Sequence, residues 1–120
     1  MKLFQKFCFF LAIITGIFIF YISSRSFPPN PLPEFDWTSI IYHFGIFLIF
    51  CFLLALALQG NYFIVLIFSW VYAGLDELHQ YFVPNRVCDI FDFYTDATGC
   101  IIGLFFALIL IWCLNRNKLI

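Results

Sequence analysis

The sequence predicts an all-α integral membrane protein, with four transmembrane helices in an antiparallel bundle. Of its 120 residues, 64% are hydrophobic and only 11% are charged. This is too apolar for a soluble domain, which must cover its core with polar residues. Four apolar runs, each near the roughly 20 residues that cross a bilayer, take up most of the chain. We therefore expect a single domain over residues 1–120.

The first two spans are expected at about residues 4–22 and 37–58. The first follows Lys2 and Lys6, and the sequence around Ser23 is a poor cleavage site for a signal peptide, so we expect this helix to be retained. The proline-rich segment 27–34 cannot continue a helix. Trp37 opens the second span at the interfacial depth that indoles favour.

The last two spans are expected at about residues 62–83 and 91–114. Gln59-Gly60-Asn61 makes a tight return into the third span, which stops before Pro84. Most basic residues then lie on the side shared by the two termini: Lys2, Lys6, Arg116 and Lys118. The positive-inside rule predicts that both termini are cytoplasmic.

Ionisable residues within the spans gather toward the opposite, outer side. At about 1.5 Å per residue, His43 lies roughly 9 Å inward from Trp37, and Asp96 lies roughly 7 Å along the fourth helix. Asp76, roughly 20 Å along the third helix, reaches a similar depth. Because charge inside a membrane is costly and usually marks a site, we expect an outward-facing polar pocket between the second, third and fourth helices.

The third helix carries most of this chemistry. Asp76, His79 and Gln80 share one face. Glu77 is rotated about 100° from them, and we expect it to line the edge of the pocket or to pair with Arg86, whose guanidinium can meet a carboxylate bidentately.

The fourth helix carries Asp92, Asp96, Gly99 and Gly103 along one stripe. The spacing of the two glycines lets membrane helices approach closely. We expect Gly45 and Gly74 to serve the same purpose on their own helices.

Nucleic-acid binding is disfavoured, because the chain has no basic run or aromatic platform that would follow a phosphate backbone. Its five cysteines form no CxxC pair, and four lie in apolar stretches, so a disulfide framework is not expected. Cys88 alone falls in an expected loop.

Residues 36–103 resemble the VanZ-like family of small four-helix membrane proteins. The resemblance rests on His43, on Asp76-Glu77-Leu78-His79-Gln80, on Val83-Pro84-Asn85-Arg86, and on Asp92 to Gly99. Asn85 stands where the family usually has glycine, but it can adopt the same left-handed turn. Asp96 replaces a common asparagine, and the family's Asp-Lys pair before His43 is missing. The resemblance implies a role in the cell envelope and, for founding members, in resistance to glycopeptide antibiotics of the teicoplanin type.

Two functions fit this arrangement, and the sequence leaves binding and catalysis both open. In the first, the protein binds or modulates an anionic lipid or a lipid-linked envelope intermediate at the outer face of the cell membrane. The ligand-binding residues expected for this function are His43, Asp76, Gln80, Arg86, Asp92 and Asp96. In the second, the protein is a membrane-embedded hydrolase or transferase acting on an envelope lipid. Glu77 or His79 would then be the catalytic acid or base.

A metal is an open question for the enzyme. Its candidate ligands are His43, Asp76, His79 and Asp96. Ion or proton transport is disfavoured, since the inner halves of the spans offer no relay of ionisable groups. In the remaining alternative, the same residues are ion pairs that fix the register of the helices.

Overall fold

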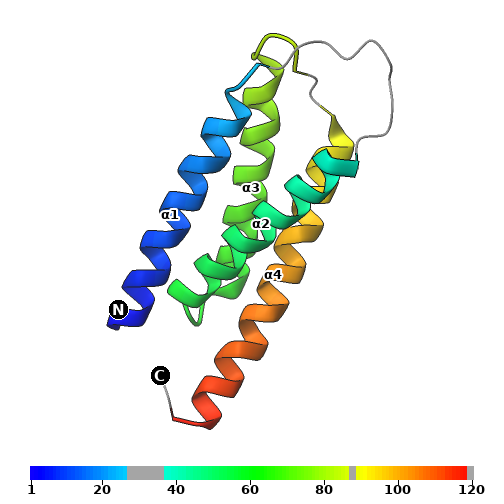
Figure 1. The fold of residues 1–120 in the computed structure, drawn as a ribbon. Coiled ribbons are helices and arrows are strands. Elements are labelled where there is room, and N and C mark those ends of the chain that lie inside the picture. The colour runs from blue at the N-terminus through cyan, green and yellow to red at the C-terminus, as the bar shows by residue number, and fades with distance from the viewer. Residues whose placement is uncertain (27–36, 87–88, 119–120) are drawn as a thin grey trace.

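The computed structural model describes residues 1–26, 37–86 and 89–118. Within these ranges it contains four helices (Figure 1). Their bounds are α1 Leu3–Ser23, α2 Trp37–Ala57, α3 Tyr62–Tyr81 and α4 Ile90–Arg116. Each begins and ends within three residues of its predicted span. The proline-rich segment, Glu34, Asp36 and Cys88 lie outside the described residues.

The helix ends follow from local sequence. α3 stops at Tyr81, three residues before Pro84, and Asn85 then takes a left-handed φ of 62°, the turn expected for it from the sequence. Asp89 caps α4 by accepting a hydrogen bond from the Phe91 backbone N–H at 2.9 Å.

Three of the four helices, α1, α2 and α4, are long and apolar enough to cross a membrane. α3 has 20 residues, but its last two turns carry Asp76, Glu77, His79 and Gln80, which lower its mean hydropathy. The chain thus has the helices of a membrane protein, and α3 is the helix with the polar end turns.

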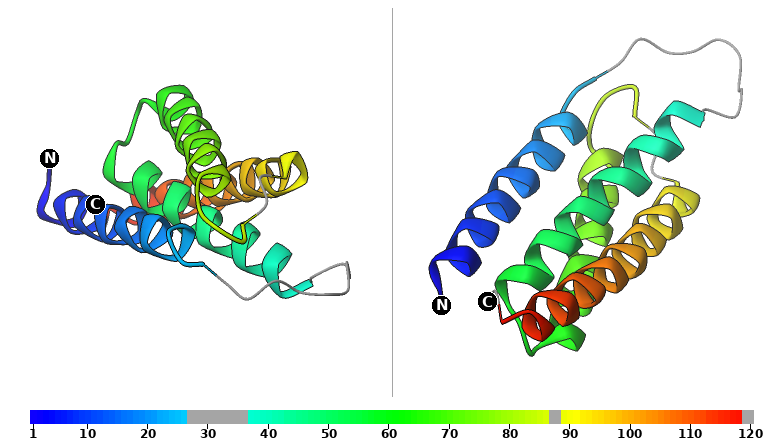
Figure 2. Two further views of the ribbon diagram at one scale, coloured as in Figure 1. Left: turned by 90° about the horizontal axis from the view of Figure 1, so that it is seen from above. Right: turned by 60° about the horizontal axis from the view of Figure 1, so that its bottom comes forward.

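Helix α2 lies at the centre of the bundle (Figures 1 and 2). It packs most extensively against α4 and also against α1, whereas α1 and α3 touch only slightly. The start of α1 and the end of α4 lie at one end of the bundle, and the ends of α1 and α3 lie at the other (Figure 1). We call the latter the polar end, because the buried ionisable residues lie toward it.

The predicted role of Gly99 and Gly103 is confirmed. A Cβ atom at Gly99 would lie 2.5 Å from the Phe44 carbonyl oxygen, and one at Gly103 would lie 2.2 Å from that of Leu48. The same expectation is wrong for Gly45, which has no atom within 4 Å of such a Cβ. At Gly74 the nearest atom is at an ordinary contact distance, 3.7 Å.

Candidate functional site

Three helices bring one ionisable side chain each to a buried cluster near the polar end. His43 of α2 lies with its Nδ1 atom 2.8 Å from Asp96 Oδ1 of α4. Glu77 of α3 joins them: one donor atom from each of the three residues lies within 4.8 Å of the other two. Asp92, one turn before Asp96, lies 3.9 Å from His43 Nε2 and is partly exposed. We call His43, Glu77 and Asp96 the three-helix cluster.

The hydrogen bonding of this cluster is incomplete. Glu77 Oε2 accepts a bond from the Asp89 backbone N–H at 3.4 Å, but Glu77 Oε1 and Asp96 Oδ2 are buried and have no hydrogen-bond partner among the described residues. An unsatisfied buried carboxylate oxygen is costly, so each such group calls for an explanation.

A second polar cluster joins α1 to α3. The Ser23 hydroxyl donates to Asp76 Oδ1. Gln80 Nε2 donates to Ser23 Oγ at 3.1 Å and to Asp76 Oδ2 at 3.4 Å. All three residues are buried.

Residues nearer the ends of α1 and α3 extend the contact between these two helices toward solvent. Ser24 Oγ lies 2.8 Å from His79 Nε2, and the imidazole stacks on Phe20 with ring centroids 4.6 Å apart. Beyond them, Asn85 Nδ2 donates to Ser26 Oγ at 3.5 Å. α1 and α3 are therefore fastened together at the polar end.

The structure arranges the predicted site residues differently from the expectation. Asp76, His79 and Gln80 share a face, as predicted, but that face meets α1 rather than α2 and α4. Glu77, expected at the edge, lies instead against His43 and Asp96. His43, Asp76, Glu77, Gln80 and Asp96 are buried against other side chains, whereas the sequence predicted that they would line an open pocket; His79, Arg86 and Asp92 remain partly exposed.

Arg86 lies in the turn after α3, where its backbone N–H donates to the Val83 carbonyl. The side chain is partly exposed. The turn that carries it follows α3 directly, next to Asn85, whose side chain donates to Ser26 beyond the end of α1.

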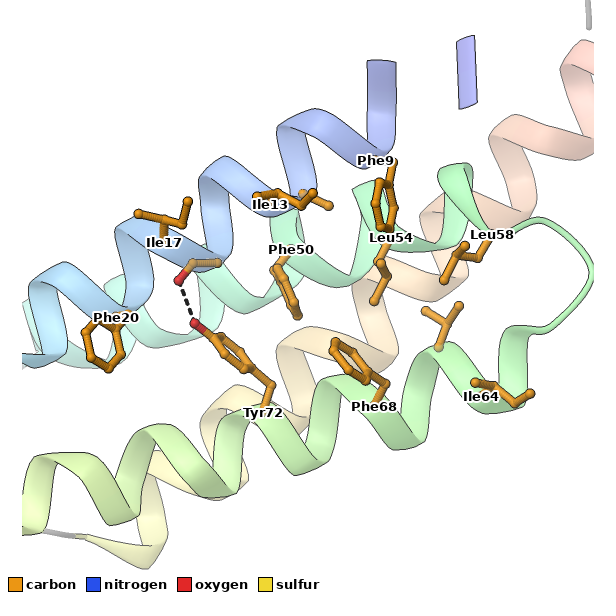
Figure 3. Close-up of a pocket in the computed structure, with 13 residues that line it drawn as sticks. Phe9, Ile13, Ile17, Phe20, Phe50, Leu54, Leu58, Ile64, Phe68 and Tyr72 are labelled. Atoms are coloured by element: carbon orange, nitrogen blue, oxygen red, sulfur yellow. Dashed lines mark hydrogen bonds between the residues drawn. The ribbon is translucent and has the colours of Figure 1, made fainter. Parts of the chain in front are cut away.

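The larger cavity is apolar and lies below the second cluster, between α1, α2 and α3 (Figure 3). It has a volume of about 600 Å³. Its wall toward α3 includes Tyr72, whose hydroxyl donates to the Gly16 carbonyl at 2.5 Å. Its lining residues are Phe9, Ala12, Ile13, Gly16, Ile17, Phe20, Phe50, Leu54, Leu58, Ile64, Val65, Phe68 and Tyr72.

This groove opens sideways, toward the lipid that would surround the bundle. Several of its lining side chains remain largely exposed, among them Ile17 at 64% and Phe68 at 55%. The sequence analysis missed the groove, because a run of apolar residues in a membrane helix does not show which of them lie apart from a neighbouring helix. Ser23 and Ser24, two hydroxyls at the end of the first apolar span, were a usable signal for the polar contact between α1 and α3.

Comparison with known protein families identifies the family of this chain. The model of the family described as VanZ/LLP1 matches residues 3–112. The chain belongs to the VanZ/LLP1 family. Neither the curated proteins nor the solved structures contain a match to the chain.

The match covers nearly the whole of this VanZ/LLP1 protein, including all of α1. The first helix is thus part of the family's domain, in keeping with its place as one wall of the groove and one half of the second polar cluster.

Proposed function

We propose that this VanZ/LLP1 protein binds an anionic membrane lipid or lipid-linked envelope intermediate. An acyl or isoprenoid chain occupies the groove between α1 and α3, and the head group lies beside His79 and Arg86. The observation that carries the proposal is the groove itself: an apolar cavity of about 600 Å³ whose lining reaches Phe20, the ring on which the His79 imidazole stacks.

The dimensions of the groove favour a lipid chain over a partner helix. Along α1 it extends from Phe9 to Phe20, which at 1.5 Å per residue is roughly 16 Å, about half of the 30 Å hydrocarbon layer. That is the depth of one leaflet. A helix of the same length, about 10 Å wide, would fill more than about 1,200 Å³.

The side chains at the polar end favour an anionic head group. Asp76 is buried and already bonded to Ser23 and Gln80. The accessible basic groups there are His79, Arg25 and Arg86, whereas the accessible acids Asp89 and Asp92 lie at the start of α4. A guanidinium can hold two oxygens of one phosphate, so Arg86 suits a phosphorylated head group.

A lipid site in one leaflet needs a defined topology. We propose that α3 crosses the bilayer with the other three helices, that both termini are cytoplasmic, and that the polar end faces outward. Lys2, Lys6, Arg116 and Lys118 at the terminal end support this orientation. A role in the cell envelope, including tolerance of glycopeptides of the teicoplanin type, would follow from binding a precursor lipid there.

Replacing Arg86 tests the function. In native mass spectrometry of protein released from nanodiscs of phosphatidylglycerol and phosphatidylcholine, the unaltered chain is expected to retain phosphatidylglycerol. Arg86→Ala removes the guanidinium and is expected to lower that retention about tenfold, as for the loss of one charge-assisted contact.

The matched control is Arg116→Ala. Arg116 lies at the other end of the bundle, over the Trp112 ring at 5.3 Å, and its removal is expected to leave retention unchanged. An unaltered chain that retains neither lipid, or equal retention by Arg86→Ala, would contradict the proposal.

A further inference from the structure

We infer that the three-helix cluster is a binding site for a divalent transition-metal ion. His43, Glu77 and Asp96 come from α2, α3 and α4, and their exposed fractions are 3%, 5% and 0%. One donor atom from each lies within 4.8 Å of the others. This site is separate from the lipid groove, which lies between α1 and α3.

The unpartnered oxygens point to a missing positive charge. Glu77 Oε1 and Asp96 Oδ2 are both buried without a hydrogen-bond partner among the described residues. Two carboxylates and one imidazole meet here, and a protonated imidazole can balance only one of the two negative charges. Because an uncompensated charge is expensive in an apolar interior, a divalent cation that binds both carboxylates would stabilise the arrangement.

The donor set selects the kind of metal. Imidazole nitrogen together with carboxylate oxygen suits ions of the zinc and manganese range. With metal–ligand distances of about 2.0–2.2 Å, two donor atoms on one ion lie no more than about 4.4 Å apart. The three donor atoms therefore need only small side-chain rotations to close on an ion.

Asp92 connects the cluster with the polar end. Asp92 lies between the cluster and solvent, with its side chain 20% exposed and its Oδ2 atom 3.9 Å from His43 Nε2. Asp89, the residue that precedes α4, donates its backbone N–H to Glu77 Oε2. A hydrated ion can meet Asp92 first and lose its water stepwise toward His43.

Metal binding can be measured directly on the full chain. The protein is purified in nanodiscs, stripped with EDTA, and titrated by calorimetry with Zn²⁺ alone and with Mn²⁺ alone. We expect one equivalent of metal to bind. Glu77→Gln, which keeps the shape of the side chain and removes its charge, is expected to weaken binding at least about tenfold.

The neighbouring residue provides the control. Asp76→Asn alters an equally buried acid on the same helix, but Asp76 faces Ser23 of α1, so metal affinity is expected to stay within about twofold of the unaltered chain. His43→Asn is a second cluster variant for the case in which Glu77→Gln does not fold. Absorption of bound Co²⁺ provides a second readout, because its visible bands report nitrogen and oxygen ligands.

Two results would overturn the inference. One is an unaltered chain that binds neither ion. The other is a pair of folded cluster variants that bind metal as tightly as Asp76→Asn does. Either would mean that protons, not a metal, neutralise the two carboxylates. The lipid proposal has its own readout, retention in native mass spectrometry, so failure of one leaves the other in place.

Discussion

Gly99 and Gly103 allow the backbone of α4 to lie directly against that of α2. With any side chain at Gly103, the first carbon would lie 2.2 Å from the Leu48 carbonyl oxygen, well inside van der Waals contact. The close approach also holds Asp96, one turn before Gly99, within hydrogen-bonding distance of His43. At the residue scale, the lack of side chains at Gly99 and Gly103 therefore positions Asp96 close to His43.

Substituting these positions should therefore separate packing glycines from the rest. Gly103→Ala forces α2 and α4 apart and is expected to lower the free energy of unfolding by about 1–3 kcal/mol, the usual cost of overpacking. Gly45→Ala, where the added carbon meets no atom within 4 Å, is expected to be neutral or stabilising by up to about 1 kcal/mol. Thermal unfolding in the same detergent compares them, and equal losses of stability in the two variants would contradict the assigned packing.

Two adjacent acids on α3 illustrate how one residue step changes the role of a side chain. Asp76 meets the Ser23 hydroxyl and the Gln80 amide, whereas Glu77 lies near His43 and Asp96 on another face of α3. A step of one residue turns a helix by about 100°. α3 therefore supplies both Asp76, which binds Ser23 of α1, and Glu77, the third residue of the three-helix cluster.

At the scale of the element, the sequence was sufficient to predict the helices. Four apolar runs bounded by Pro84, Gly60 and charged residues placed each helix end within a few residues, because hydropathy and proline act locally. Counting residues down two helices from the same side also predicted that His43 and Asp96 lie at a similar depth, and their side chains are 2.8 Å apart.

The neighbours of each helical face could not be predicted in this way. Periodicity shows that Asp76, His79 and Gln80 share a face of α3, but it does not show that this face meets α1. The groove is hidden for the same reason. Membrane helices associate through packing rather than through a contrast of polarity, so Ile13 and Ile14 read alike in sequence although only Ile13 lines the cavity.

At the scale of the whole molecule, the account requires one orientation in the bilayer. The polar end carries the buried acids, both histidines and the fastened ends of α1 and α3, and the proposed topology turns it outward. Reporter fusions that fluoresce only in the cytoplasm are expected to be active at both termini. A fusion placed at Asn85, in the turn at the polar end, is expected to be inactive. Fluorescence of that fusion, with none from fusions at the two termini, would contradict the proposed topology.

The central claim is that a lipid chain occupies the groove between α1 and α3. Ile13 and Ile14 are 47% and 46% exposed, which makes them a matched pair: Ile13→Trp fills the groove, and Ile14→Trp adds the same surface outside it. The decisive measurement is retention of phosphatidylglycerol in native mass spectrometry. The account predicts that Ile13→Trp loses most of the retained lipid while Ile14→Trp matches the unaltered chain, and equal retention by the two variants would contradict it.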